Sequence, residues 1–342
     1  MNKLERYSRQ ILFKPIGEEG QLKLMTKKAV IVGMGALGTV ISNHLVRSGV
    51  GHVRLIDRDL VEVSNLQRQS LYDEEDAEKN LPKVIAAEKK LKKINSTVTV
   101  EPIISDVNLD NAEELLGGFD VIVDGTDNFS TRYLINDVSI KLGIPWVFGA
   151  AVSARGMHAV FIPGKTPCYR CLFPEVQTGL GETCDTVGVL SPITEIIGSF
   201  EAVEALKILV GAETNPNLEQ FDIWYNSPLQ MDVSKGKNPE CPACVHHQYE
   251  FLDRSSKQQI SYAILCGRDT VQINPRNVNE FDLSELAERL KESGKVMVNS
   301  FLLRFSPEEN IKMVFFQDGR VLIHGVDDIA AAKSYYSRYM GG

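Results

Sequence analysis

The fold of this chain is constrained most strongly by a short apolar run that leads into three closely spaced glycines. All four residues of the run Ala29–Val32 are apolar, which predicts a strand buried on both faces. A G-x-G-x-x-G turn follows, formed by Gly33, Gly35 and Gly38. A helix is predicted at 36–47, and a second apolar strand ends at Asp57. This order predicts a phosphate cradle, because backbone N–H groups at a helix start face an anion while Asp57 accepts ribose hydroxyls.

Composition places the chain among globular proteins and argues against two kinds of partner. With 342 residues, 43% of them hydrophobic, the chain has enough apolar side chains for a large core and a smaller second domain. The formal net charge of −8 and the lack of a basic stripe argue against nucleic acid. No apolar run reaches the roughly 18 residues of a membrane span, and the first residues lack a signal-peptide pattern. We therefore expect a cytoplasmic protein without a membrane partner.

Strand and helix signals alternate as far as Gly149, which predicts a doubly wound, Rossmann-like, mostly parallel sheet with helices on both faces. After Gly149 come an irregular cysteine-containing segment, a long helix at 191–210, and strands near 221–225 and 229–233. The last 80 or so residues have their own strand and helix signals. We expect an N-terminal arm at 1–27, a nucleotide-binding domain with zinc knuckles at 28–250, and a small α+β accessory domain at 258–342.

The glycine fingerprint alone favours NAD or FAD, but two cations near it favour a triphosphate. Arg68 and Lys83 follow the Asp57 strand and flank a helix start. A triphosphate has more negative charge than the pyrophosphate of a dinucleotide, and an arginine can hold a phosphate through two N–H groups. The competing interpretation for each cation is an exposed salt bridge.

Asp127 lies just past the carboxyl end of a predicted strand, near the same crevice. A carboxylate beside phosphates is the usual ligand for Mg²⁺, which a dehydrogenase does not need. The alternative for Asp127 and Asn128 is helix capping.

Two C-x-x-C pairs predict one structural zinc site: Cys168, Cys171, Cys241 and Cys244. Redox activity is the alternative, but a redox pair usually opens a helix, whereas prolines border these pairs. Cys184 lies in a glycine-rich stretch shortly before a helix start, where a thiol can act as a nucleophile. Cys266 lies in an apolar strand and is expected to be a packing residue.

Several motifs occur together in one family. The chain contains Arg6-Tyr-Ser-Arg9-Gln10, the glycine fingerprint, Ser64-Asn-Leu-Gln-Arg68-Gln, Pro82-Lys83, Asp124-Gly-Thr-Asp127-Asn128 and the paired cysteines. In this order, over residues 1 to about 247, they resemble the bacterial ThiF/MoeB adenylyltransferases, which are relatives of the ubiquitin-activating enzymes. The resemblance implies an enzyme that uses ATP and Mg²⁺ to adenylate the C-terminal Gly-Gly carboxylate of a ubiquitin-like sulfur carrier, releasing pyrophosphate.

The resemblance also implies roles for individual residues. Arg9 would reach the ATP of a neighbouring subunit in a homodimer, Asp127 would ligate Mg²⁺, and Cys184 would form a covalent link to the carrier in some members. The remaining nucleotide-binding residues would be Gly33, Gly35, Gly38, Asp57, Asp59, Ser64, Asn65, Gln67, Arg68, Lys83, Thr126 and Asn128. Zinc would be structural, and a desulfurase that donates sulfur is a further expected partner.

Three alternatives to this function remain at the level of sequence. They are an NAD- or FAD-dependent oxidoreductase, a scaffold that binds a carrier without turnover, and an enzyme that activates another carboxylate, such as one on a modified tRNA base. The motifs do not separate thiamine from molybdenum-cofactor supply. The terminal Gly341-Gly342 imitates a carrier tail, but the preceding helix signal argues against a fused carrier.

Overall fold

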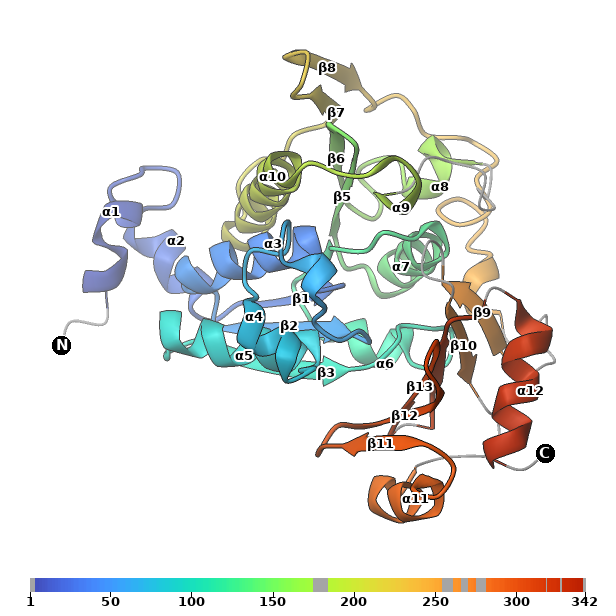
Figure 1. Cartoon of the computed structure of the whole chain (residues 1–342). Helices are drawn as coiled ribbons and strands as arrows, with labels where there is room; N and C mark the ends of the chain where they lie inside the picture. The colour runs from blue at the N-terminus through green and yellow to red at the C-terminus, as the bar shows by residue number, and fades with distance from the viewer. Residues whose placement is uncertain are drawn as a thin grey trace. The chain divides into compact units, whose positions relative to one another are not determined.

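The computed structural model describes residues 4–174, 184–253, 261–265, 270–274, 281–317, 319–326 and 328–340. The chain divides into two compact units, Met1–Arg254 and Ser255–Gly342, which are considered separately (Figure 1). Among the described helices, none is long and apolar enough to cross a membrane.

The first unit is built on an eight-stranded sheet in the order β3-β2-β1-β4-β5-β6-β7-β8. The first five strands in this order are parallel, and the last three continue the sheet in antiparallel fashion. The predicted Rossmann-like fold class is confirmed. The strands are β1 (Lys28–Val32), β2 (His52–Asp57), β3 (Thr99–Ile104), β4 (Val121–Asp124), β5 (Trp146–Val152), β6 (Arg155–Phe161), β7 (Asn217–Asp222) and β8 (Ser227–Asp232).

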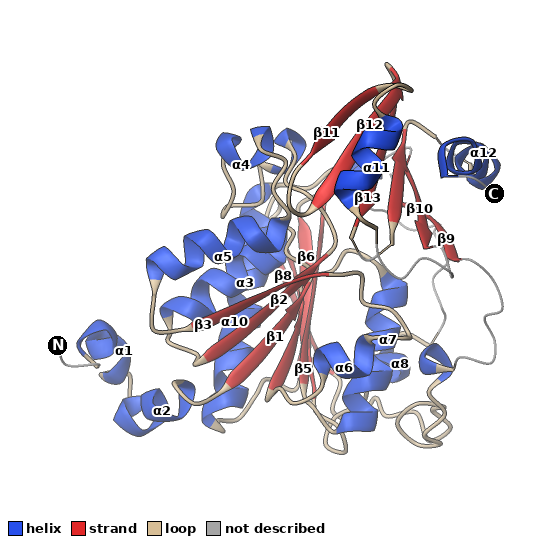
Figure 2. Ribbon diagram, turned by 90° about the horizontal axis from the view of Figure 1, so that it is seen from below, coloured by secondary structure: helices blue, strands red, loops and turns tan. Residues whose placement is uncertain are grey.

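Helices cover both faces of the parallel part of the sheet (Figure 2). Alternate residues of β1 enter two different cores: Ala29 and Ile31 pack with α3 (Ala36–Arg47), α5 (Lys83–Ile94) and α10 (Ser191–Val210). Val30 and Val32 pack on the other side with α6 (Ala112–Leu116) and α7 (Phe129–Leu142). This explains the uninterrupted apolar run, because a strand buried on both faces has no polar position.

The N-terminal arm folds as η1 (Glu5–Tyr7), α1 (Ser8–Ile11) and α2 (Gly17–Leu24). Tyr7 attaches the arm to the first unit: its ring is buried, and its hydroxyl accepts a hydrogen bond from Asn95 Nδ2 at 2.9 Å. Leu12 and Phe13 nevertheless remain 70% and 60% exposed. The arm therefore presents an apolar surface that nothing in the described chain covers.

The strand expected at 221–225 is shifted in the structure. β7 ends at Asp222, and Trp224 and Tyr225 lie in an exposed turn before β8. Their aromatic side chains favoured a strand, but the register of β7 is set by its pairing with β6, where Glu219 lies opposite His158.

Near the end of the first unit, η3 (Glu250–Leu252) is held against α7 by an arrangement that we term the linker clasp. Asp137 Oδ2 accepts a hydrogen bond from the Phe251 amide at 3.0 Å, and the Phe251 ring stacks on Tyr133 at 4.9 Å. The Arg170 guanidinium lies over both rings and pairs with Glu250 at 2.9 Å. Arg170 belongs to α8 (Tyr169–Leu172), so the clasp joins the first cysteine pair to the segment that leads to the second unit.

The second unit contains a six-stranded antiparallel sheet in the order β11-β12-β13-β14-β10-β9. The strands are β9 (Ser261–Leu265), β10 (Thr270–Asn274), β11 (Lys295–Val298), β12 (Leu302–Glu308), β13 (Ile311–Phe316) and β14 (Val321–His324). α11 (Leu283–Leu290) and α12 (Ile329–Met340) pack on one face of the sheet. β10 and β12 were not expected from the sequence.

Candidate functional site

The predicted crevice lies where the strand order reverses. The chain runs outward from β1 through β2 to β3 and then returns to place β4 on the other side of β1. The turns after β1 and β4 touch: a Cβ on Gly33 would lie 2.6 Å from Gly125 O, and one on Gly38 would lie 2.0 Å from Gly33 O. Gly33 also has φ +91°. These glycines are therefore required for the close packing of the two turns at the point where such folds bind ligands.

Gly35 differs from its neighbours because it faces open space. A Cβ there would meet only Gln69 Nε2, at 3.9 Å. The side chain of Gln69 is buried, and its amide oxygen has no hydrogen-bond partner within the described chain. An open glycine at the N-terminus of α3 beside an unsatisfied buried amide is what a nucleotide-binding cradle requires. Gln69 was not among the predicted site residues, although it closes the quoted Ser64–Gln69 motif.

Asp57 fixes the cradle from the second strand. Its carboxylate accepts hydrogen bonds from the amides of Met34 at 2.6 Å and Asp59 at 2.7 Å. Lys83, only 3% exposed, donates to Asp59 Oδ2 at 3.0 Å. Burial and the Asp59 charge raise the pKa of Asp57, and Lys83 opposes this effect. The structure thus brings Asp57, Asp59 and Lys83 together at the carboxyl edge of the sheet.

The loop after β2 is ordered by its own polar groups. Arg58 donates to Asp106 at 3.0 Å, which links the loop to the residues after β3. Asn65 is buried and accepts a hydrogen bond from the Glu62 amide at 3.1 Å. Arg68 donates to Ser64 O, and its side chain, like those of Ser64 and Gln67, reaches solvent.

The turn after β4 holds Asp127 in an exposed position. The Asp127 carboxylate has no hydrogen bond or ion pair to any described residue, whereas its neighbour Thr126 is bonded to Asp124. Asn128 is the N-cap of α7 and accepts a hydrogen bond from the Thr131 amide at 2.9 Å. The capping alternative therefore describes Asn128, while Asp127 keeps its carboxylate free for a cation.

Arg9 lies on α1, in the arm, with an exposed side chain that has no described partner in the chain. The other residues predicted to contact the nucleotide lie on the loops that follow β1, β2 and β4 or at the helix starts after them. Arg9 lies outside these loops, on the N-terminal arm.

The four paired cysteines converge. Their sulfur atoms all lie within 4.8 Å of one another, and three of the separations are 3.8, 3.6 and 3.5 Å. A tetrahedral zinc with Zn–S bonds of about 2.3 Å needs sulfur atoms roughly 3.8 Å apart. The Asn238 amide donates to Cys171 Sγ at 3.4 Å, which suits a sulfur with thiolate character. Cys168 does precede a helix, but it is a helix of only four residues, so the fourfold cluster favours a metal over a redox pair.

Four residues singled out from the sequence carry no structural argument. Cys184 opens the short helix α9 (Cys184–Val187), but its side chain is not described. Cys266 and Gly341-Gly342 lie outside the described residues.

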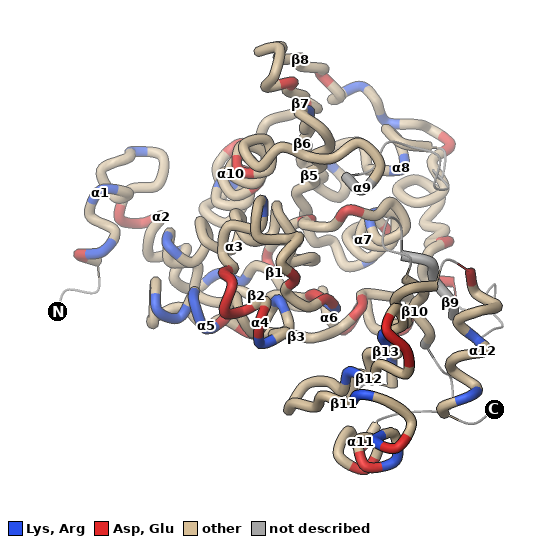
Figure 3. Tube along the Cα trace, viewed as in Figure 1, with Lys and Arg blue, Asp and Glu red and all other residues tan. Residues whose placement is uncertain are grey.

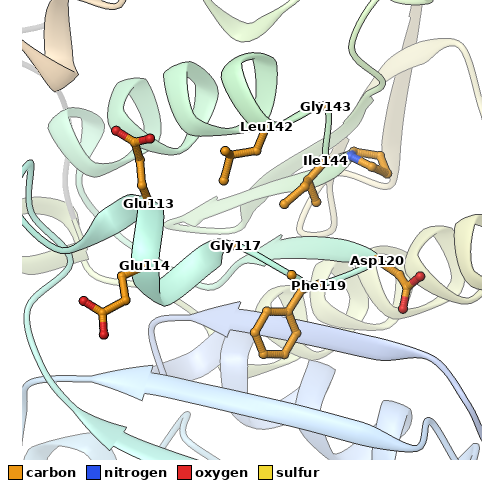
Figure 4. A pocket seen from close by; sticks show the side chains of 10 residues that line it. Glu113, Glu114, Gly117, Phe119, Asp120, Leu142, Gly143 and Ile144 are labelled. Carbon is orange, nitrogen blue, oxygen red and sulfur yellow. The ribbon is translucent and has the colours of Figure 1, made fainter.

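A hollow of about 730 Å³ lies at the opposite end of the strands, before β4 and β5 (Figure 4). Its wall includes Phe119, Leu142 and Ile144, and its rim includes the carboxylates of Glu113, Glu114 and Asp120. Glu113 and Asp120 are already paired with Lys141 and Lys27, each at 2.7 Å, and the described lining of the hollow includes no lysine or arginine. This lining therefore lacks the cations that a triphosphate requires, and the hollow does not compete with the glycine cradle. Away from this hollow, basic and acidic residues are interspersed along the trace of the first unit (Figure 3).

A crevice at the strand reversal, a glycine cradle and a four-cysteine cluster define an α/β protein with a candidate nucleotide site and a candidate metal site. The ThiF family model matches residues 7–243, and the chain belongs to the ThiF family. The predicted family resemblance is confirmed, and the dinucleotide oxidoreductase loses its support.

Similar proteins extend the match. The chain is 46% identical over 337 residues to the sulfur carrier protein ThiS adenylyltransferase of Bacillus subtilis, covering 98% of this chain and 99% of that protein. It is 39% identical over 272 residues to the sulfur carrier protein adenylyltransferase of Thermus thermophilus, covering 77% and 97%. A crystal structure of MccB from E. coli superposes with a TM-score of 0.62 at 24% identity, covering 70% and 75%, which supports the fold.

Proposed function

We propose that this protein is an adenylyltransferase that activates the C-terminal Gly-Gly carboxylate of a ubiquitin-like sulfur-carrier protein with ATP. The observation that carries the proposal is the 46% identity with a ThiS adenylyltransferase across nearly the whole of both chains. The glycine cradle with Lys83 and Asp57 beside it supports the proposal, because it combines an anion site with a ribose acceptor.

The residues of the cradle fit ATP and Mg²⁺. Gly33 and Gly35 would place backbone N–H groups near the phosphates, and Asp57 would accept ribose hydroxyls. Lys83 and Arg68 would neutralise phosphate charge. The exposed Asp127 carboxylate is a suitable oxygen ligand for Mg²⁺, which when bound offsets negative charge on the phosphates. Asp59, Ser64, Asn65, Gln67, Thr126 and Asn128 would order the loops around these groups.

The reaction needs no general base, because the attacking carboxylate is already an anion. A carboxylate oxygen forms a bond to the α-phosphorus, and the bond from that phosphorus to the bridging oxygen breaks. Pyrophosphate leaves with the bonding electrons, and an acyl adenylate remains on the carrier. The chain's own contribution is to hold the two anions in line and to offset their mutual repulsion through Lys83 and Arg68.

We propose a carrier of the ThiS type, and with it a role in thiamine thiazole biosynthesis, because the relative with 46% identity is named a ThiS adenylyltransferase. Supply of a molybdenum-cofactor carrier is the nearest alternative, because adenylyltransferases named MOCS3 are also similar: one from Culex quinquefasciatus is 39% identical over 246 residues, covering 71% of this chain and 56% of that protein.

We propose a homodimer, which two features of the arm support. The exposed Leu12 and Phe13 would supply an apolar contact surface, and the exposed Arg9 on the arm would reach the partner's phosphates. We also propose structural zinc at the four cysteines, Cys184 as the residue that links covalently to the carrier, a desulfurase as sulfur donor, and an accessory role for residues 258–342.

Intact mass spectrometry tests the proposal. Incubation with ATP, Mg²⁺ and a ThiS-type carrier should give a carrier adduct with the mass of an adenylate, and a carrier lacking its final glycine should give none. A molybdenum-type carrier that reacts in preference to the ThiS type would overturn the pathway assignment. No adduct with any Gly-Gly carrier would overturn the function.

A further inference from the structure

Three ionisable side chains are buried next to the turn that carries Asp127. Asp124 and Glu201 are completely buried, and Arg132 is 5% exposed. Burying an ionisable group in a protein interior is unfavourable unless partners compensate it. The hydrogen bonds of two of them, Asp124 and Arg132, converge on one residue of the turn, Thr126.

Thr126 is held by both members of an ion pair. Its amide and hydroxyl donate to Asp124 Oδ1 at 2.9 and 2.6 Å, and its carbonyl accepts from Arg132 Nη2 at 2.7 Å. Arg132 Nε donates to Asp124 Oδ2 at 2.9 Å and closes the ring. The residue immediately before Asp127 therefore has its N–H, its C=O and its side chain fixed by buried groups. Asp127 itself has no hydrogen bond to a described residue.

Arg132 is in turn fixed by its surroundings. Its Nη2 also donates to Gly149 O at 3.1 Å, and its guanidinium lies 5.0 Å from the centre of the Phe148 ring. The planar Arg132 guanidinium thus donates hydrogen bonds to Asp124, Thr126 and Gly149 at the same time. A lysine ammonium, a point charge on a flexible stem, cannot reproduce three fixed directions.

Glu201 lies against the same Gly149 but bonds to nothing in the turn. A Cβ on Gly149 would come within 2.2 Å of the Glu201 carboxyl group, whose oxygens have no partner in the described chain. Burial and the Asp124 charge raise the pKa of Glu201 well above its usual value, which favours the neutral form. The negative charge that faces the Arg132 guanidinium is therefore supplied chiefly by Asp124.

We propose that Arg132, paired with Asp124, is the positioning residue that aims the Asp127 carboxylate at the divalent cation of the nucleotide site. The inference rests on the proposed function. Loss of a group that orients a metal ligand typically weakens metal affinity about 10-fold to 100-fold.

Electron paramagnetic resonance of Mn²⁺ with a non-hydrolysable ATP analogue tests the inference without relying on turnover. Arg132→Lys keeps the buried positive charge, and it should weaken Mn²⁺ binding at least about 10-fold while the zinc content stays that of the wild type. Arg132→Gln should weaken it further. Glu201→Gln is the matched control, because it changes a buried group of the same cluster that does not contact Thr126, and it should bind Mn²⁺ as the wild type does.

The outcomes of this experiment distinguish failure of the positioning role of Arg132 from failure of the proposed adenylyltransferase function. If Arg132→Lys binds Mn²⁺ as tightly as the wild type, the positioning role is wrong and the proposed function stands. If Glu201→Gln weakens binding as much as Arg132→Lys, the effect reports general disturbance of the core and the positioning role is again wrong. If the wild type itself binds no Mn²⁺ with the analogue, the proposed function fails.

Discussion

Asparagine in place of Asp137 should stabilise the protein at neutral pH. Asp137 is 3% exposed and accepts the Phe251 amide in the linker clasp. Burial raises its pKa from 3.8 to about 6, against the opposing effect of that hydrogen bond. Asparagine has nearly the same shape, and its Oδ1 can accept the same N–H without ever carrying a charge.

The pKa difference sets the size of the effect. Because the folded pKa is raised, the native state binds more protons than the unfolded chain between pH 3.8 and about 6, and stability falls as pH rises through that window. One pKa unit corresponds to about 1.4 kcal/mol, so the ionised carboxylate costs about 3 kcal/mol above pH 6. Asp137→Asn should be more stable than the wild type by about 1 kcal/mol at pH 4.5, and the gain should approach about 3 kcal/mol at pH 7.5.

Urea unfolding followed by tryptophan fluorescence, at pH 4.5 and 7.5 with equal zinc, measures this gain. Zinc loss in acid affects both proteins alike and cancels in their difference. Glu114→Gln, which neutralises an exposed carboxylate, is the control and should change stability by less than about 0.5 kcal/mol at either pH. A variant that is less stable than the wild type at pH 7.5 would show that the ionised carboxylate stabilises the clasp, and the reasoning would be refuted.

Four further substitutions test the phosphate contact, the glycine cradle and the cysteine cluster. Lys83→Met should lower the rate of ATP–pyrophosphate exchange by about 10²- to 10³-fold, and unchanged exchange would remove Lys83 from phosphate neutralisation. Gly35→Ala should keep the wild-type melting temperature but lose ATP binding in calorimetry, because its Cβ enters open space, whereas Gly33→Ala should unfold at lower temperature because it meets Gly125 O. Cys241→Ser should lose the bound zinc measured by plasma mass spectrometry and melt at a lower temperature; retained zinc would contradict a four-thiolate site.

Elements with strong periodicity were predictable from the sequence. The helices at 36–47 and 191–210 occur with the predicted bounds, since each has a clear start signal and an apolar face. β12 was missed because Leu302–Glu308 contains Arg304 and Pro307, which weaken a strand pattern that its two neighbours in the sheet stabilise.

The sequence predicted which loops form the site, but it did not predict the side-chain contacts within the site. Parallel strands bring their carboxyl ends to one edge, so Asp57, Lys83 and Asp127 could be expected at the same crevice. The orphaned amide of Gln69, the Arg132–Thr126 bonds and the linker clasp depend on side-chain packing between segments distant in sequence. No local pattern encodes such packing.

Carrier-dependent ATP–pyrophosphate exchange tests the central claim most directly. With labelled pyrophosphate, the wild type should form labelled ATP only when a ThiS-type carrier ending in Gly-Gly is present, and Asp127→Ala should form none while keeping its zinc. Exchange that proceeds equally without the carrier, or that is absent with every Gly-Gly carrier, would contradict the claim.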